Sequence, residues 1–302
     1  MPTADRPGAV LSGDTIAIAR GKMRRLIEHG FKARQRREDG GLDARLVLAH
    51  QLQLSRTDLI AAADRAVTAG QATALTALAV ERGAGVPVAR LVGEAEFWSL
   101  KFYLSAETLV PRQDSELLVE AALSRIGNQA SQILDIGTGS GCLPLAILSE
   151  RPAASALGTD ISSDALATAR RNAGRLHLAD RFSTRLSDVF DRLEDCDPFD
   201  LIISNPPYIA SAVIDDLDSE VRDHDPRRAL DGGADGLDFY RRLATQSAAF
   251  LRPEGYLMVE IGFDQAVSVA ALLQQAGYSS EVLRDLAGHP RVLIGQKIGR
   301  KR

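Results

Sequence analysis

The sequence is poor in the side chains that bind metals or form disulfides. Its 302 residues include only two cysteines and five histidines. Cys142 and Cys196 lack the spacing of a metal or redox motif, and the histidines are scattered. We therefore expect no metal site. Cys142 lies beside a glycine-rich loop, but we interpret it as a small thiol that packs in the interior.

Long uncharged apolar runs are also absent. Nowhere do about 18 apolar residues follow one another without a charge, and residues 1–10 contain no apolar segment typical of a signal peptide. We expect neither membrane insertion nor export, and hence a cytoplasmic protein.

The chain lacks an excess of positive charge. Lysine and arginine number 36 and aspartate and glutamate 40, for a net charge of −4, whereas nucleic-acid binders usually present a basic face. One stretch near the amino terminus is locally basic, with Glu28 as the only acid among Arg20, Lys22, Arg24, Arg25, Lys32, Arg34, Arg36 and Arg37. It is either a solvated helix face or a docking surface for an acidic partner.

Two kinds of hydrophobic pattern divide the chain. Up to about Glu81, apolar residues recur every three or four positions, which predicts helices. Glycines and Pro87 then break the pattern, and the alternation that follows indicates a short hairpin or linker. We expect a helical domain over residues 1–85, a linker or β-hairpin over residues 86–110 and a second domain over residues 111–302.

Helices and strands alternate beyond Pro111. The predicted helices cover residues 114–126, 143–150, 163–176, 237–250 and 266–276, and the predicted strands 132–136, 155–159, 182–186, 200–204, 255–261, 280–286 and 291–296. This order predicts a mostly parallel sheet with helices on both faces, and the final hairpin permits one antiparallel strand. The expected fold class is α/β: a doubly wound, Rossmann-like sheet preceded by a small all-helical domain.

A pair of prolines follows one predicted strand. Asn205-Pro206-Pro207-Tyr208 comes directly after Ser204, and open α/β sheets bind their ligands at the carboxyl ends of strands. The prolines fix φ and have no N–H, so their carbonyls are held in place as acceptors. With the Asn205 side-chain oxygen as a second acceptor and the Tyr208 ring for stacking, the motif can hold a planar group that carries an NH2. The other interpretation is a turn that merely ends a strand.

A glycine-rich loop follows the first predicted strand of the sheet. It consists of Gly137, Thr138, Gly139, Ser140 and Gly141, with Asp135 just before it. Glycines allow a ligand to approach the backbone closely. Asp160 ends the next strand, 19 residues after Gly141, and can accept both hydroxyls of a ribose.

Two cofactors compete for this loop. NAD is disfavoured because the spacing is Gly-x-Gly-x-Gly rather than Gly-x-Gly-x-x-Gly, and no obvious acid or base for hydride transfer follows. S-adenosylmethionine fits better, with its amino-acid tail in the loop and its ribose at Asp160. Asp188 is then a candidate for the adenine amino group, with Val189 and Phe190 against the ring; a loop cap is the alternative role of Asp188.

The two motifs together fit methyl transfer to a nitrogen. An amide or aromatic amine nitrogen is a poor nucleophile, and it gains positive charge as the new bond forms. Acceptors on its two N–H bonds, the side-chain oxygen of Asn205 and the backbone oxygen of Pro206, would stabilise that charge most in the transition state. No general base need act first, because the remaining proton becomes acidic after alkylation.

These residues resemble the HemK/PrmC family, which methylates the glutamine side-chain nitrogen in the Gly-Gly-Gln loop of class I peptide chain release factors. The resemblance runs from about Leu42 to Arg291, and besides the two motifs it covers Gly93–Trp98, Leu109–Glu116 and Asp235–Tyr240. It implies that the helical domain docks the release factor, and we expect a monomer because the substrate loop must enter an open cleft.

The resemblance also implies roles for single residues. It places the cofactor against Gly137, Thr138, Gly139, Ser140, Gly141, Asp160, Val189 and Asn205, and the glutamine amide against Asn205, Pro206, Pro207 and Tyr208. The chain departs from the family at Gln113, where proline is usual, and at Val189, where some members have an aromatic residue. Arg112 and Glu116 either order the pocket entrance or are paired surface charges.

Three functions are compared. The first is a protein-glutamine N5-methyltransferase that acts on release factors. The second is an N6-adenine methyltransferase of DNA or RNA, since the same motif can grip a flipped adenine. The acidic stretch 215–225 would repel phosphate, so we expect no direct nucleic-acid partner. The third is a non-catalytic cofactor-binding module. Asn205→Ala tests the proposed mechanism, which intact methyl transfer by that variant would contradict.

Overall fold

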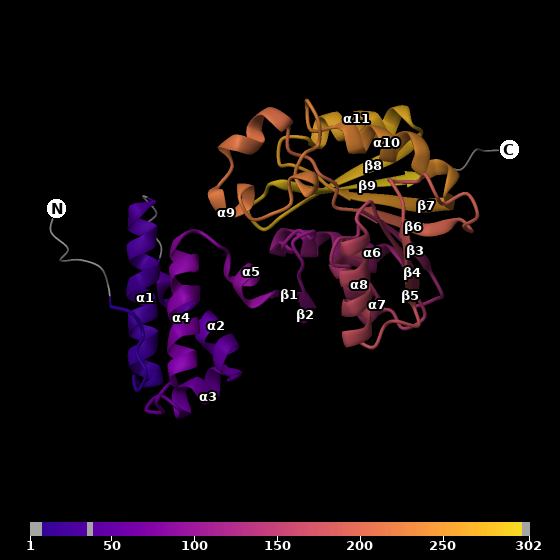
Figure 1. The fold of residues 1–302 in the computed structure, drawn as a ribbon. Helices are drawn as coiled ribbons and strands as arrows, with labels where there is room; N and C mark the ends of the chain where they lie inside the picture. Colours follow the sequence, from indigo (N-terminus) through magenta and orange to yellow (C-terminus); the bar gives the residue numbers. More distant parts are fainter. Residues whose placement is uncertain (1–7, 35–38, 298–302) are drawn as a thin grey trace. The chain divides into compact units, whose positions relative to one another are not determined.

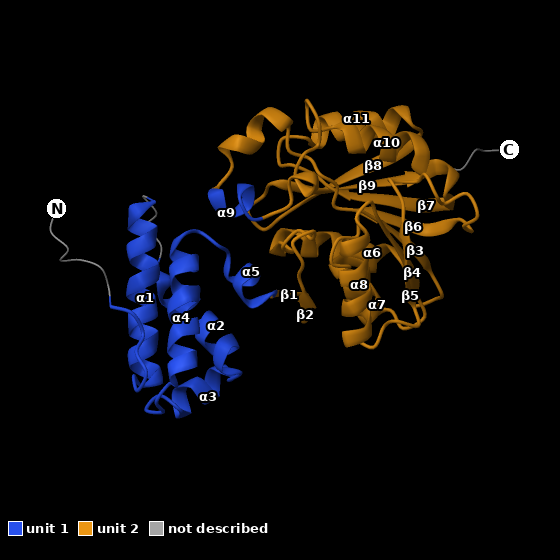
Figure 2. Cartoon of the chain, viewed as in Figure 1, with its two compact units in different colours: residues 1–93, 219–224 blue, residues 94–218, 225–302 orange. Residues whose placement is uncertain are grey.

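The computed structural model describes residues 8–34 and 39–297. The chain forms two compact units, one made of residues 1–93 and 219–224 and the other of residues 94–218 and 225–302 (Figure 2). The division between them falls at different residues from the expected domain boundaries. In particular, the short segment 219–224 clusters with the amino-terminal unit, although it follows the sixth strand in sequence.

The amino-terminal unit is helical (Figure 1). Its helices are α1 (Ile16–Ala33), α2 (Gly40–Leu52), α3 (Arg56–Ala61), α4 (Ala69–Gly83), α5 (Val88–Val92) and α9 (Ser219–Arg222). Thr68 begins α4 with a capping box, in which its side chain and that of Gln71 each accept from the other's backbone N–H. Helices α1 and α4 approach closely, because a Cβ on Gly30 would lie 2.5 Å from the Gly83 carbonyl oxygen.

Arg82 of α4 explains why α9 belongs to this unit. Its guanidinium is almost fully buried, bonds Asp43 of α2 at 2.6 Å and pairs with Glu220 of α9. It also lies 4.7 Å from the centre of the Phe31 ring. A buried cation needs such partners, so these residues hold α2, α4 and α9 together.

The second unit begins with a hairpin of β1 (Glu94–Phe97) and β2 (Leu100–Tyr103). Trp98 and Ser99 form its two-residue turn, both with positive φ, as a type I′ turn requires. The N–H of Trp98 donates to Glu116 at 2.7 Å. The hairpin lies inside the segment expected to be a linker, but residues 88–92 before it form the helix α5 rather than an extended strand.

The main sheet has seven strands in the order β5-β4-β3-β6-β7-β9-β8 (Figure 1). They are β3 (Gln132–Ile136), β4 (Ser155–Asp160), β5 (Phe182–Leu186), β6 (Phe199–Ser204), β7 (Leu251–Glu260), β8 (Tyr278–Arg284) and β9 (Pro290–Lys297). All neighbouring pairs are parallel except those of β9, which is antiparallel to both β7 and β8. The predicted α/β fold class is thus confirmed, including its single antiparallel strand.

Helices cover both faces of this sheet. The larger ones are α6 (Glu116–Arg125), α7 (Cys142–Glu150), α8 (Ser163–Arg175), α10 (Asp238–Gln246) and α11 (Ala266–Gln275), and the 3-10 turns are η1 (Gln113–Ser115), η2 (Ser211–Asp216), η3 (Arg227–Ala229) and η4 (Ser247–Ala249). One apolar core contains residues of α6, α7 and α8, and a second contains residues of α10 and α11. No described helix is both long and apolar enough to span a bilayer.

The strand order reverses between β3 and β6. The chain leaves β3 toward β4 on one side, whereas β6 lies on the other, which opens a crevice beyond their carboxyl ends. Ile136 and Ser204 pair as the last residues of these strands, and the Ser204 hydroxyl donates to the Ile136 carbonyl at 2.7 Å. The topology therefore brings the glycine-rich loop and the Asn-Pro-Pro-Tyr motif to one place.

Candidate active site

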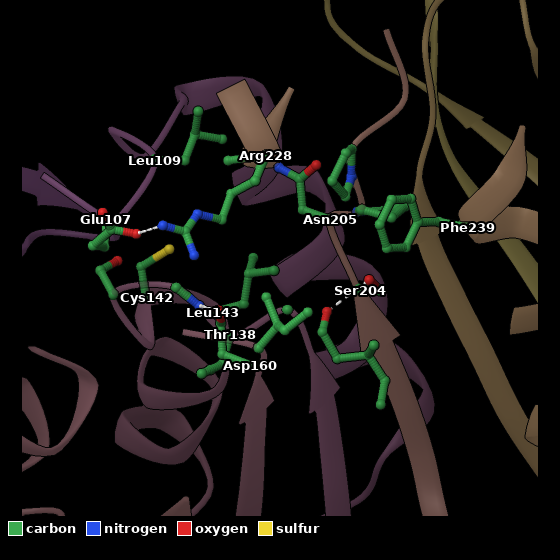
Figure 3. A pocket seen from close by; sticks show the side chains of 18 of the residues that line it. Glu107, Leu109, Thr138, Cys142, Leu143, Asp160, Ser204, Asn205, Arg228 and Phe239 are labelled. Carbon is green, nitrogen blue, oxygen red and sulfur yellow. Dashed lines mark hydrogen bonds and ion pairs between the residues drawn. The ribbon is translucent and has the colours of Figure 1, made fainter. Parts of the chain in front are cut away.

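A cavity of about 240 Å³ lies at this switch point (Figure 3). Residues of the glycine-rich loop after β3, Asp160 at the end of β4 and Asn205–Pro207 after β6 all contribute to its wall. Elements far apart in sequence thus converge on a single site, as the sequence predicts.

The glycine-rich loop turns through conformations that favour glycine. Gly137, Gly139 and Gly141 have φ of +73°, +54° and +78°. A Cβ on Gly137 would meet no atom within 4 Å, so the loop leaves open space beside its backbone. Gly141 is not among the described residues that line the cavity; it is the N-cap residue that precedes α7.

Asp160 is held by the backbone on both carboxylate oxygens. Gly139 N–H donates to Oδ2 at 3.0 Å, and Ser162 N–H donates to Oδ1 at 2.9 Å. Burial raises its pKa above the usual range, although these bonds oppose that effect. The carboxylate is therefore oriented at the cavity wall, where each oxygen retains a lone pair for a further donor.

Unsatisfied polar groups surround the same loop. The hydroxyls of Thr138 and Ser140 are buried and have no hydrogen-bond partner within the described part of the chain. Asp135 is buried beneath the loop, and burial raises its pKa to about 7. Native proteins seldom leave buried polar atoms unpaired, so these atoms indicate a polar ligand. Together with the open space at Gly137, they fit the amino-acid tail and ribose of S-adenosylmethionine.

The segment 187–190, which was expected to contact the adenine, lines the cavity only in part. Val189 lines the cavity with φ of +53°, a costly conformation for a β-branched residue. Asp188 also lines it, but its Oδ1 accepts a 2.8 Å hydrogen bond from Arg242. Phe190 does not belong to the described lining; its buried ring stacks on Phe250, 4.9 Å between centres. The expected contact of Phe190 with the adenine is not supported by this lining and stays a prediction.

Asn205, Pro206 and Pro207 line the cavity, but Tyr208 is not among the described lining residues. The backbone oxygen of Tyr208 accepts a hydrogen bond from the Gln265 side chain at 2.9 Å. Burial raises the pKa of the Tyr208 hydroxyl to about 12. The aromatic residue at the cavity is Phe239 of α10 (Figure 3). Its segment, Asp235–Tyr240, is part of the resemblance, yet nothing in the sequence singled out this ring.

Two further residues form a hydrogen-bonded chain with the Asn205 side chain: Ser115 bonds Asn205, and Glu260 bonds Ser115. Asn205 Nδ2 donates to the Ser115 hydroxyl oxygen at 3.1 Å, and that hydroxyl donates to a carboxylate oxygen of Glu260. Glu260 is 2% exposed at the end of β7, and burial raises its pKa to about 7. Sequence reasoning missed both residues; the available signal for Glu260 was an acid directly after the apolar run Tyr256–Val259.

Charged side chains that form ion pairs also line the cavity. Glu107 pairs with Arg228 of η3, and both line the cavity (Figure 3). Arg112, also in the lining, bonds the buried carboxylate of Asp225 at 2.6 Å. Arg112 and Glu116 therefore have different partners, and of the two Arg112 is the one among the described lining residues.

Cys142 lines the cavity, but its chemistry is passive. Burial raises the pKa of its thiol to about 12, so it is protonated at neutral pH and is not poised as a nucleophile. The described residues contain no group of three or more His, Cys, Asp or Glu side chains that could hold a metal ion.

Comparisons with known proteins identify the family. Residues 111–220 match the methyltransferase small domain, and residues 24–93 match the PrmC N-terminal domain. The release factor glutamine methyltransferase of Bradyrhizobium diazoefficiens is 48% identical over 267 residues, which cover 86% of this chain and 89% of that protein. The chain belongs to the HemK/PrmC family of release factor glutamine methyltransferases.

Other comparisons agree with membership of this family. The release factor glutamine methyltransferase of Rhodospirillum rubrum is 47% identical over 256 residues, 84% of this chain and 78% of that protein. A methyltransferase structure from Pyrococcus furiosus, 19% identical, matches 66% of this chain and 90% of its own with a TM-score of 0.50, which shows the fold alone. This HemK/PrmC member is thus an enzyme, and its methyltransferase domain implies dependence on S-adenosylmethionine.

Proposed function

We propose that this enzyme methylates the side-chain amide nitrogen (N5) of the glutamine in the Gly-Gly-Gln loop of class I peptide chain release factors. The observation that carries this proposal is the cavity, because it joins a nucleotide-type loop to the acceptors of Asn205 and Pro206. The names of the relatives support the same substrate. Since translation termination takes place in the cytoplasm, the proposed site of action is there.

Each catalytic group has a proposed role toward the glutamine amide. The side-chain oxygen of Asn205 and the backbone oxygen of Pro206 accept from its two N–H bonds, which orients the nitrogen and stabilises its growing positive charge. Pro207 keeps the motif rigid, and the Phe239 ring shields the amide from water. Tyr208 supports the motif from outside the cavity.

The glycine-rich loop and the segments beside it are proposed to bind S-adenosylmethionine, which would supply the methyl group. Gly137–Ser140 would surround the amino-acid tail, Asp160 would accept the ribose hydroxyls, and Val189 would contact the adenine. Asp188, although paired with Arg242, retains acceptor capacity for the adenine amino group. Gly141 would shape the loop without direct contact.

The helical unit is proposed to dock the release factor. It spans the expected docking domain, residues 1–85, while residues 86–110 connect it to the methyltransferase domain at residues 111–302. The basic stretch near α1 would meet acidic groups of the partner. We propose a monomer and no direct nucleic-acid partner.

Transfer of label from S-adenosylmethionine tests the function. The acceptors are purified release factor, the same factor with the Gly-Gly-Gln glutamine replaced by alanine, total DNA and total RNA. Label on the intact factor alone is the expected result. Label on nucleic acid instead would replace this proposal with the adenine alternative.

A further inference from the structure

The proposed catalysis depends on which end of the Asn205 amide faces the substrate. The oxygen and nitrogen ends of a primary amide have nearly the same shape, but only the oxygen accepts a hydrogen bond. If the NH2 end faced the cavity, it would oppose the N–H groups of a bound glutamine. The site therefore needs a device that fixes the orientation of this amide.

A chain of hydrogen bonds reaches the amide from the protein interior. Asn205 Nδ2 donates to the Ser115 hydroxyl at 3.1 Å, and Ser115 donates to Glu260. Ser115 and Glu260 are 3% and 2% exposed, so water does not compete for these bonds. The three residues come from η1, the end of β6 and the end of β7.

We propose that Glu260 is a positioning residue that acts through Ser115 to keep the Asn205 side-chain oxygen turned toward the substrate. The inference rests on the proposed function of Asn205. An ionised carboxylate has no hydrogen to give, so the single hydroxyl hydrogen of Ser115 must point at Glu260. The Ser115 oxygen can then only accept, which requires the NH2 end of Asn205 and leaves its oxygen for the substrate.

Protonation of Glu260 removes this constraint. A carboxylic acid can donate to Ser115, which can then donate to the Asn205 oxygen and reverse the amide. Arg291 of β9 favours the ionised carboxylate and Asp114 opposes it. The neutral hydroxyls of Tyr208 and Tyr240 and the thiol of Cys142 also lie within electrostatic reach. Because burial raises the pKa of Glu260 to about 7, this protonation takes place within a pH range in which methyl transfer can be assayed.

The test is the pH dependence of kcat and KM for release factor from about pH 5.5 to about pH 9, with saturating S-adenosylmethionine. Saturation with S-adenosylmethionine prevents changes in cofactor affinity, such as those from titration of Asp160, from shaping the pH profile. The wild type should lose kcat on the acid side. Glu260→Gln, whose amide can donate or accept, should lose this acid limb and have about tenfold lower kcat at alkaline pH. Glu254→Gln, an exposed substitution on the same strand, should leave the profile unchanged.

Ser115 provides a second test if Glu260→Gln does not fold. Ser115→Ala should lower kcat about tenfold without weakening S-adenosylhomocysteine binding, whereas Ser115→Thr keeps the hydroxyl and should restore kcat. An acid limb that persists in Glu260→Gln, or an unchanged kcat in Ser115→Ala, would overturn the inference. Asn205→Ala separates the two proposals: if it retains full transfer the proposed site itself is wrong, and if it is inactive only the inference about Glu260 is at stake.

Discussion

The N–H of Gly139 donates a 3.0 Å hydrogen bond to Asp160 Oδ2, across 21 residues of sequence. This bond joins the glycine-rich loop to the end of the neighbouring strand β4. The N–H of Ser162 holds the other oxygen at 2.9 Å, so the carboxylate cannot rotate freely. Two parts of the proposed cofactor site are thereby fixed relative to each other before a ligand binds.

Asp160→Asn should weaken binding of S-adenosylhomocysteine about tenfold or more. The variant loses a charged acceptor for the ribose hydroxyls, a loss of about 1.5–3 kcal/mol, and its NH2 group must face one of the two backbone N–H donors. Isothermal titration calorimetry measures the change. Asp164→Asn, exposed on α8 nearby, is the matched control and should bind like wild type. Equal affinity in both variants would remove Asp160 from the cofactor site.

Asp135→Asn should change stability in a pH-dependent way. Burial raises the folded-state pKa of Asp135 from 3.8 to about 7, so the folded protein binds a proton that the unfolded chain has released between these values. The stability of the wild type therefore falls as pH rises through this window, and the variant, whose amide does not titrate, does not share that loss. Relative to wild type, the variant should gain free energy of unfolding between about pH 5 and about pH 8.

Denaturant unfolding at the two pH values measures this gain. Asp231→Asn is the control, because the Ser211 hydroxyl lowers the pKa of Asp231 and keeps it ionised at both. Its effect on stability should be the same at each pH. A gain for Asp135→Asn that is zero or negative would show that this carboxyl is ionised throughout the range.

Gly141→Ala should destabilise the methyltransferase unit. The position has φ of +78°, and a Cβ would lie 3.2 Å from the Ala169 and Leu145 side chains. Left-handed backbone costs a residue with a Cβ about 1–2 kcal/mol, so thermal unfolding should shift to lower temperature. Gly174→Ala in α8, with no atom within 4 Å and no positive φ, should be neutral or stabilising. Equal shifts for the two variants would contradict the strain argument.

Charge reversal at Arg34, Arg36 and Arg37 should weaken release factor binding, most strongly at low salt. Arg34 lies 3.9 Å from Asp223, while Arg36 and Arg37 are outside the described residues. Affinity is measured by calorimetry at two salt concentrations, with Lys101→Glu as an exposed control. Unchanged affinity would identify the basic stretch as a solvated helix face.

The sheet was predictable because its strands are short apolar runs separated by amphipathic helices. The predicted strand 132–136 coincides with β3, and the structure extends the predicted strand 255–261 back to Leu251. Residues 88–92 were misread, since a five-residue helix has too few residues for a periodic signal.

The sequence predicted those parts of the site that consist of residues close together in the chain. The glycine-rich loop and Asn205–Pro207 are contiguous motifs, so the topology of a parallel sheet brings them together. The chain from Asn205 through Ser115 to Glu260 joins residues 90 and 145 positions apart, and no local pattern specifies it. For the same reason Phe239, rather than Tyr208, supplies the ring at the cavity.

The most direct test of the proposed function is tandem mass spectrometry of the Gly-Gly-Gln peptide of a class I release factor after incubation with S-adenosylmethionine and this enzyme. Fragmentation should place one added methyl group on the glutamine side chain with the wild type, and far less with Asn205→Ala although that variant still binds S-adenosylhomocysteine. An unmodified peptide with active wild-type enzyme, or full methylation by Asn205→Ala, would contradict the account.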